Sequence, residues 1–137
     1  MHSTAFAKLT VRPEPMGTVL IIGPWNFPFM LTIVPLVSAI AAGCTAVVKP
    51  SEVSLNTCRL LKELIPRYLD KSAFPTIFAD GQETASLLKQ HRFDLVFFTG
   101  SSTIGRLVYQ VSLSEPYPTT SNHSDHSIHS KAISNHT

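Results

Sequence analysis

The chain has 137 residues, 44% of them hydrophobic, and a formal net charge of +2. This length suits one domain, and the basic residues are scattered, so the composition gives no indication of a nucleic-acid or anionic-membrane surface. The two cysteines, Cys44 and Cys58, fit neither a disulfide framework nor a metal spacing. We interpret them as buried apolar residues of a cytoplasmic protein.

An uncharged stretch runs from Pro15 to Val48 and has the composition of a membrane span. We do not expect a span, because each interruption by glycine or proline frees backbone groups that lipid cannot satisfy. The interruptions include Gly23, Pro24, Pro28 and Pro35. Residues 1–17 form a lead-in segment without an apolar signal core, and their mildly basic character leaves a mitochondrial address open.

From Thr18 onward, short apolar runs alternate with helical patterns. The predicted elements are a strand at 19–22, a helix at 28–42, a strand at 45–48, a helix from Ser54 or Asn56 to about Tyr68, a strand at 75–78, a helix at 83–90, a strand at 95–99 and a helix that opens at 100–105. This alternation predicts an α/β fold over residues 18–112, a Rossmann-like parallel sheet with helices on both faces. The helix at 28–42 is apolar nearly all round, so we expect it to lie inside a larger body, with a bend or restart at Pro35.

The first strand runs into an unusual turn, VLIIGPWNFPF. Gly23 permits a sharp bend, the flanking prolines fix φ, and we expect Trp25 and Phe27 to bury the turn. A half-buried amide at the end of a parallel strand, here Asn26, can stabilise charge that develops on a carbonyl oxygen. The alternative is that Asn26 caps the helix that follows.

Two further polar motifs also follow predicted strands. Lys49 and Glu52 come after the second strand and offer a cation and a carboxylate for a phosphate or a ribose; the alternative is a solvated ion pair. Gly100 and Gly105 open the last helix and would let a diphosphate approach its N-terminus. Because ligands bind at the carboxyl ends of parallel strands, we expect these motifs and the Asn26 turn to form one site.

The C-terminal segment changes character. Residues 113–137 are rich in serine and histidine and poor in large aliphatic residues, which predicts a disordered tail. His123, His126 and His129 recur every three residues, a spacing that would suit a metal on a helix. We favour a biased tail over a metal site, because a metal site needs ordered surroundings.

In this order, PWNFP, KPSE and FTGSxxxG resemble the coenzyme-binding domain of the aldehyde dehydrogenase superfamily. PEPMGTVLIIGPWNFPF and LLKELIPRYLD are similar to its class 3, fatty-aldehyde branch, and the resemblance covers about residues 10–110. It implies an incomplete half-domain of that fold. It also implies oxidation of an aldehyde to a carboxylate with NAD or NADP as cofactor, and a homodimer for the full-length parent.

The resemblance also assigns roles to single residues. It implies that Asn26 is the oxyanion-hole amide. The residues that it implies for the coenzyme are Ile22 and Trp25 in the cleft, Lys49 and Glu52 at the adenosine ribose, Gly100, Ser101 and Gly105 at the diphosphate turn, and Ile104 beside the adenine.

Two family motifs do not occur in this sequence. The family's catalytic cysteine and its E-L-G-G-K glutamate follow the FTGS helix, and neither motif is present. Cys44 and Cys58 do not occupy the nucleophile's place. We therefore expect a fragment that is inactive alone, and the alternative function is that of a non-catalytic nucleotide-binding or interaction fragment.

Overall fold

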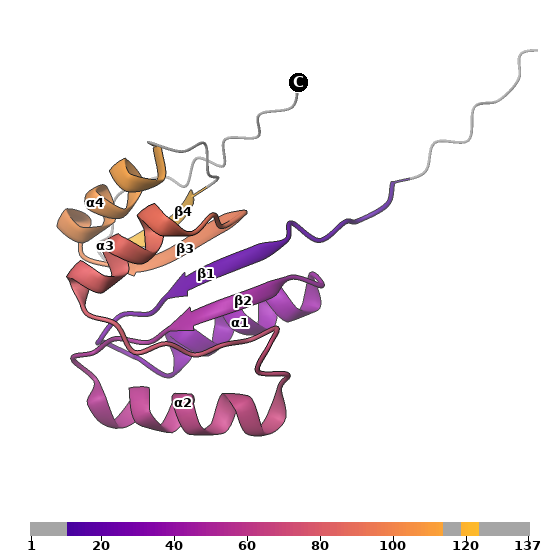
Figure 1. Cartoon of the computed structure of the whole chain (residues 1–137), viewed down its shortest axis with the longest axis horizontal. Helices are drawn as coiled ribbons and strands as arrows, with labels where there is room; N and C mark the ends of the chain where they lie inside the picture. The colour runs from indigo at the N-terminus through magenta and orange to yellow at the C-terminus, as the bar shows by residue number, and fades with distance from the viewer. Residues whose placement is uncertain (1–10, 114–118, 124–137) are drawn as a thin grey trace, which may run out of the picture.

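The computed structural model describes residues 11–113 and 119–123 of the chain. Each strand is followed by one or two helices before the next strand begins (Figure 1). The elements are β1 (Thr18–Ile22), α1 (Met30–Ala41), β2 (Thr45–Lys49), α2 (Leu55–Tyr68), α3 (Gly81–Gln90), β3 (Leu95–Gly100), α4 (Ser102–Leu113) and β4 (Thr119–His123).

The strands form one parallel sheet in the order β2-β1-β3-β4. Consecutive strands in the chain are separated by helices, which cover both faces of the sheet (Figure 1). The predicted α/β fold is confirmed, and β1, β2 and β3 match the predicted strands at 19–22, 45–48 and 95–99 to within a residue at each end.

The strand predicted at 75–78 does not form, and only a bridge between Thr76 and Val48 is present. The amide of Val48 donates to the carbonyl of Pro75, and the amide of Ile77 donates back to Val48, both at 2.9 Å. In this register the next ladder bond would come from the amide of residue 75 to Ala46. Pro75 has no N–H, so the ladder is interrupted there.

Each face of the sheet carries its own hydrophobic core, because successive β1 side chains point to opposite faces. Val19 and Ile21 lie in the core beneath α1 and α2, whereas Leu20 and Ile22 lie in the core beneath α3 and α4. Both predicted cysteine burials are confirmed: Cys44 and Cys58 are free thiols, 5% and 1% exposed. Cys44 belongs to the α1/α2 core.

Two helices differ from their predicted bounds. α3 begins at Gly81 rather than at residue 83, because Asp80 and Glu83 form a reciprocal capping box. The Asp80 carboxylate accepts from the amides of residues 82 and 83 at 2.8 Å, and Glu83 accepts from the Asp80 amide at 2.9 Å. α1 runs through Pro35 as one helix. Its inner side is buried, and its outer side is exposed in the described part of the chain.

The strand β4 falls in the segment predicted to be disordered, so the prediction differs from the structure at Thr119–His123. These residues pair with β3 through parallel backbone bonds, which need no large side chain, and they begin with two β-branched threonines. The rest of 114–137 lies outside the described residues. So do the side chains of the three histidines proposed as an alternative metal site.

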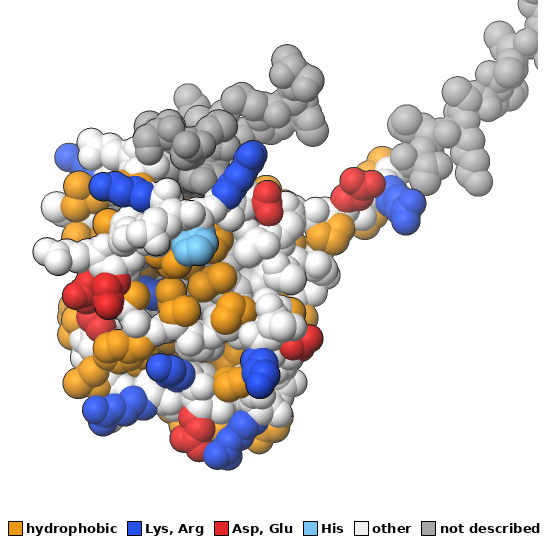
Figure 2. Space-filling model, viewed as in Figure 1, with side chains coloured by type: hydrophobic (Ala, Val, Ile, Leu, Met, Phe, Trp, Pro, Cys, Tyr) orange, Lys and Arg blue, Asp and Glu red, His pale blue; other side chains and the backbone are white. Residues whose placement is uncertain are grey.

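The surface shown in Figure 2 mixes Lys and Arg with Asp and Glu, and hydrophobic side chains lie between them. Among the described residues, no helix is both long enough and apolar enough to cross a membrane. The uncharged stretch from Pro15 to Val48 instead forms β1, α1 and most of β2. Its uncharged composition therefore belongs to two buried strands and a helix.

Candidate functional site

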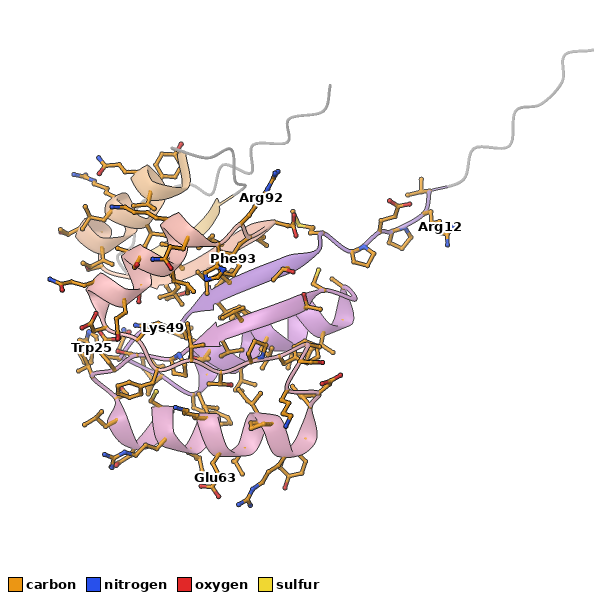
Figure 3. All side chains as sticks on the ribbon, in the orientation of Figure 1. Arg12, Trp25, Lys49, Glu63, Arg92 and Phe93 are labelled. Carbon is orange, nitrogen blue, oxygen red and sulfur yellow. The ribbon has the colours of Figure 1, made fainter. Side chains whose placement is uncertain are left out.

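Three polar turns lie at the carboxyl edge of the sheet. Ile22 at the end of β1 is in register with Lys49 on β2 and with Phe98 on β3. Adjacent strands lie about 5 Å apart, so β2 and β3, on either side of β1, end roughly 10 Å from each other. Trp25 and Lys49 both lie at this end of the sheet in Figure 3. The structure thus brings the turns after β1, β2 and β3 to one edge, as the sequence predicts.

The turn after β1 is tied to three neighbouring elements. The Gly23 amide donates to the Lys49 carbonyl at 2.9 Å, which ties it to β2. A Cβ on Gly23 would lie 2.1 Å from Oγ1 of Thr32 in α1, so α1 packs against the bare backbone. The Ser54 hydroxyl, at the start of α2, donates to the Trp25 carbonyl at 2.9 Å. Phe27 has a φ of +48°, a strained value for a residue with a side chain, and these ties hold it there.

Asn26 sits half-buried in the middle of this turn. It does not cap α1, because the N-cap residue is Phe29 and no side chain makes a capping bond, so the capping alternative is wrong. The expectation that aromatic rings bury the turn is also wrong: Trp25 is 66% exposed and Phe27 is 70% exposed. The turn lies at the rim of the sheet, where backbone hydrogen bonds hold it and the rings have no core to enter.

Lys49 and Glu52 form an ion pair behind this turn. Nζ of Lys49 lies 2.6 Å from Oε2 of Glu52, and the lysine is only 5% exposed. Burial by itself would raise the pKa of Glu52, but the hydrogen bond from Lys49, a hydrogen bond from the backbone amide of Glu52 and the charge of Lys49 together outweigh it, so the pKa lies below its usual value. The alternative of a solvated pair is wrong for the lysine. The carboxylate stays ionised and partly exposed, which suits an acceptor of hydroxyl hydrogen bonds.

The two glycines after β3 both pack on the ring of Phe98. A Cβ at Gly100 would lie 2.6 Å from Cζ of that ring, and a Cβ at Gly105 would lie 3.2 Å from Cε1. Between them Ser101 precedes α4: its carbonyl accepts from the Gly105 amide at 2.9 Å, and its hydroxyl accepts from the Ile104 amide at 3.4 Å. The result is a bare backbone turn at the N-terminus of a twelve-residue helix, where anions are stabilised.

Two of the predicted coenzyme residues, Ile22 and Ile104, differ in how exposed they are at this edge. Ile22 is 5% exposed and packs in the core beneath α3 and α4, so its side chain supports the edge from within. Ile104 is 50% exposed on the first turn of α4, where a flat ligand could contact it. All the predicted site residues therefore lie at one edge, but Ile22 contributes packing there and not open surface.

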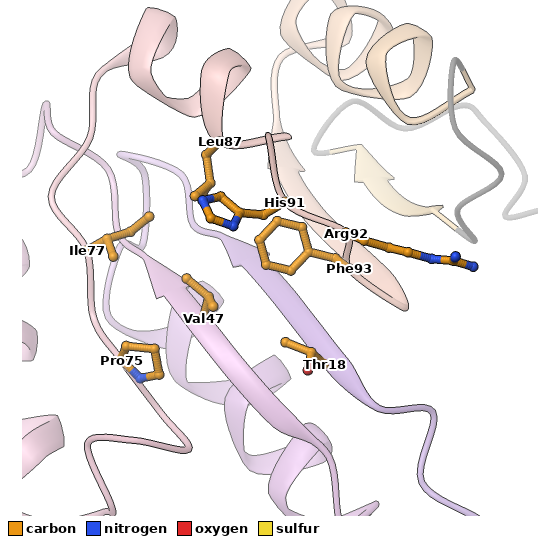
Figure 4. Close-up of a pocket in the computed structure, with 8 residues that line it drawn as sticks. All are labelled: Thr18, Val47, Pro75, Ile77, Leu87, His91, Arg92 and Phe93. Carbon is orange, nitrogen blue, oxygen red and sulfur yellow. The ribbon is translucent and has the colours of Figure 1, made fainter. Parts of the chain in front are cut away.

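A cavity of about 330 Å³ lies elsewhere, on the α3 side of the sheet (Figure 4). It contains none of the predicted site residues. His91 and Phe93 extend over it from the end of α3, while Val47 and Ile77 lie on its other side (Figure 4). Thr18, at the first position of β1, also lines it, so the cavity lies toward the amino ends of the strands. It is not part of the carboxyl edge.

Three residues that shape the edge were not predicted: Thr32 beneath Gly23, Ser54 on the Trp25 carbonyl, and Phe98 beneath the two glycines. Ser54 was predicted as a helix cap, and it does precede α2, but its hydroxyl bonds the turn instead. Because side chains alternate between the two faces of a strand, the position of Phe98 two residues after Val96 could have indicated that both point into the same core. No sequence signal marks Thr32, because its role depends on how α1 crosses Gly23.

Comparison with known proteins identifies relatives of this chain. The aldehyde dehydrogenase family profile matches residues 2–121. Aldehyde dehydrogenase family 3 member A2 of Rattus norvegicus is 49% identical over 117 residues, which are 85% of this chain and 24% of that protein. Aldehyde dehydrogenase family 3 member B1 of Homo sapiens is 49% identical over 118 residues, 86% of this chain and 25% of that protein.

Solved structures of aldehyde dehydrogenases are also similar to this chain. The substrate-bound AldH of Staphylococcus aureus superposes with a TM-score of 0.77 at 45% identity, covering 80% of this chain and 24% of that one. A mutant of aldehyde dehydrogenase C from Pseudomonas syringae, in complex with NAD⁺ and octanal, gives 0.74 at 32% identity over 80% of this chain and 23% of that one. The chain thus spans about a quarter of the length of the relatives it matches. The match includes all three polar turns, and the chain belongs to the aldehyde dehydrogenase family.

Proposed function

We propose that this chain forms the coenzyme-binding part of an NAD(P)-dependent aldehyde dehydrogenase, which oxidises an aldehyde to a carboxylate. One observation carries the proposal: the Asn26 turn, the Lys49–Glu52 pair and the bare turn at Gly100 lie at one sheet edge. When bound, a nicotinamide coenzyme supplies the hydride acceptor for this oxidation. The chain's own residues bind and orient the reactants.

The turn between Gly100 and Gly105 is the proposed diphosphate site. The Phe98 ring occupies the side on which a Cβ would stand, so the turn presents backbone without side chains at the glycines. Ser101 lies at the start of α4, and the N-terminus of that helix favours negative charge. Ile104, half-exposed on the same turn, offers an apolar contact for an adenine ring.

The Lys49–Glu52 pair is the proposed ribose site, and it favours NAD⁺ over NADP⁺. A carboxylate accepts hydrogen bonds from both ribose hydroxyls but repels a 2′-phosphate. The lysine opposes that repulsion, because its ammonium lies 2.6 Å from the carboxylate and would attract an added phosphate. We therefore expect a moderate preference, about 1–2 kcal/mol or roughly 5- to 30-fold in affinity.

Asn26 is the proposed oxyanion donor. Its side chain does not cap α1, and the turn that carries it is tied to β2, α1 and α2. A donor fixed in this way costs little reorganisation as charge develops on a carbonyl oxygen. The attacking thiol must come from outside these 137 residues, whose two cysteines are Cys44 and Cys58. Both described cysteines are buried, and burial raises the pKa of Cys58.

The buried cysteines also favour a second candidate function, a nucleotide-binding or interaction fragment without catalysis. Titration of the chain with NAD⁺ and NADP⁺ supports coenzyme binding if NAD⁺ binds more tightly and Glu52→Gln reduces the difference. Glu63→Gln is the matched control, because that glutamate is 58% exposed on α2 and pairs only with Arg67 among its described contacts. If the wild type, Glu52→Gln and Glu63→Gln have the same ratio of NAD⁺ affinity to NADP⁺ affinity, Glu52 is only a carboxylate at a strand end.

The catalytic role is tested in a full-length chimera, in which residues of this chain replace the matched part of the rat relative. Asn26→Ala should lower kcat about 10²- to 10³-fold, as loss of an oxyanion donor does. Asn56→Ala, on the exposed side of α2, is the matched control and should leave kcat unchanged. If the two variants have similar kcat, Asn26 is not the oxyanion donor.

A further inference from the structure

The hydroxyl of Ser54 is turned away from the helix that it precedes. Ser54 is the N-cap residue of α2, and a serine at that position ordinarily accepts a hydrogen bond from an amide of the first helical turn. Here no side-chain capping bond forms. The hydroxyl instead donates to the carbonyl of Trp25, 29 residues earlier in the chain, at 2.9 Å. The start of α2 therefore lacks a local stabilising bond, and the turn after β1 has gained one.

That bond acts on the peptide unit that leads into Asn26. A peptide unit is planar, so the Trp25 carbonyl and the nitrogen and Cα of Asn26 lie in one plane. On the other side of Asn26, the Phe27 carbonyl accepts from the Leu31 amide at 3.0 Å. Phe27 keeps its strained φ of +48° between these two bonds, and such strain persists only where the surroundings hold it. The side chain of Asn26 thus projects from a backbone that is held both before and after it.

The Ser54 hydroxyl can be removed without changing the contacts of the proposed ribose site. Nζ of Lys49 and Oε2 of Glu52 contact each other directly at 2.6 Å. The segment that joins this pair to α2 is closed by a backbone bond, from the Ser54 amide to the Ser51 carbonyl at 3.2 Å. Neither contact uses the Ser54 hydroxyl. We therefore expect its loss to act on the Asn26 turn and not on the coenzyme contacts.

We propose that Ser54 is a positioning residue that holds the Asn26 amide through the Trp25 carbonyl, a role that rests on the proposed function of Asn26 as oxyanion donor. Such a donor contributes most when its direction is fixed before charge develops on the carbonyl oxygen. A displacement of about 1 Å can cost roughly 10²-fold in rate. Because Ser54 acts through the turn, loss of its hydroxyl lowers kcat and leaves coenzyme affinity unchanged.

In the full chain, the bond is tested by the resonances of the Trp25 carbonyl carbon and the Asn26 side-chain amide. Ser54→Ala should shift the first and give the second the relaxation of a mobile group, whereas Ser54→Thr, which keeps the hydroxyl, should restore both. Ser38→Ala is the matched control, because that hydroxyl also donates to a backbone carbonyl, the one of Val34 at 3.1 Å, but within α1. It should change neither resonance. If Ser54→Ala leaves both resonances as in the wild type, the proposal is wrong.

In the full-length chimera with the rat relative, the effect on the reaction is measured. Ser54→Ala should lower kcat about 10- to 100-fold, less than Asn26→Ala does, and leave the dissociation constant of NAD⁺ unchanged. Ser54→Thr and Ser38→Ala should keep the wild-type kcat. In a chimera that already carries Asn26→Ala, Ser54→Ala should lower kcat no further, because the group that it positions is gone.

The failure of this proposal is distinguishable from the failure of the proposed function. If Asn26→Ala leaves kcat unchanged, Asn26 is not the oxyanion donor, and the positioning role fails with it. If Asn26→Ala lowers kcat but Ser54→Ala does not, the positioning role alone is overturned. The same holds if Ser54→Ala lowers kcat equally with and without Asn26, or if its main effect is weaker binding of NAD⁺.

Discussion

The contact between Gly23 and Thr32 gives a stability prediction that can be worked out from the structure. A Cβ at Gly23 would lie 2.1 Å from Oγ1 of Thr32 and 3.3 Å from its Cβ. Thr32 is fully buried in α1, so neither side chain can turn outward to relieve the overlap. Gly23→Ala should therefore destabilise the fold by about 3 kcal/mol, the upper range for overpacking a core.

Removal of the threonine hydroxyl should relieve that cost. Thr32→Ala alone loses a buried methyl group, about 0.8 kcal/mol, but it also removes a buried hydroxyl that has no hydrogen-bond partner, so its net effect should be within about 1 kcal/mol. In Gly23→Ala/Thr32→Ala, the shortest of these contacts lengthens from 2.1 to 3.3 Å. The double variant should be more stable than additivity predicts by about 2 kcal/mol.

Urea unfolding of the wild type, the two single variants and the double variant measures this coupling. A coupling of about 2 kcal/mol supports the packing of α1 directly on the turn that carries Asn26. If the two single effects add to within about 0.5 kcal/mol, the close contact does not exist in solution and the turn is held differently.

Three further predictions use the same protein. The Lys49–Glu52 pair should stabilise the fold at pH values above the ordinary pKa of a glutamate, and this contribution should disappear as the pH falls through the lowered pKa of the folded state. The difference in unfolding free energy between wild type and Glu52→Gln, measured against pH, should therefore shrink in acid. A difference that stays constant with pH would contradict this prediction. Asp80→Ala should cost about 1–2 kcal/mol by removing the capping box of α3, and a loss below about 0.3 kcal/mol in urea unfolding would mean that the box contributes nothing. The chain alone should produce no NADH from aldehydes, because Cys58 is buried and its raised pKa keeps it a thiol; steady NADH production abolished by replacing a cysteine would refute this.

The sequence predicted the parallel sheet and its edge for two reasons. Hydrophobic patterns that mark strands and helices are local, and strands separated by helices pair in parallel. β1, β2 and β3 are continuous apolar runs, so strand type and order of elements followed directly. The strand at 75–78 failed for a local reason, the missing amide of Pro75, which the apolar pattern does not report. β4 was missed because composition describes burial and not backbone pairing.

At the site, the sequence predicted which turns would meet but not how they are held. Lys49 and Glu52 were expected as a cation and a carboxylate, and the structure adds that the lysine is buried and lowers the pKa of its partner. The exposure of Trp25 could not be predicted, because an aromatic ring in a turn has no periodic pattern to indicate which way it faces. Thr32 required knowledge of how α1 crosses β1.

The central claim is that the carboxyl edge of the sheet binds a nicotinamide coenzyme. Amide chemical shifts of the isotope-labelled chain, followed during titration with NAD⁺, test it most directly. We predict saturable shifts at 23–29, 49–52 and 100–105, with the cavity beside His91 unaffected. Shifts confined to the residues around that cavity, or no saturable shifts at all, would contradict the assignment of this edge as the coenzyme site.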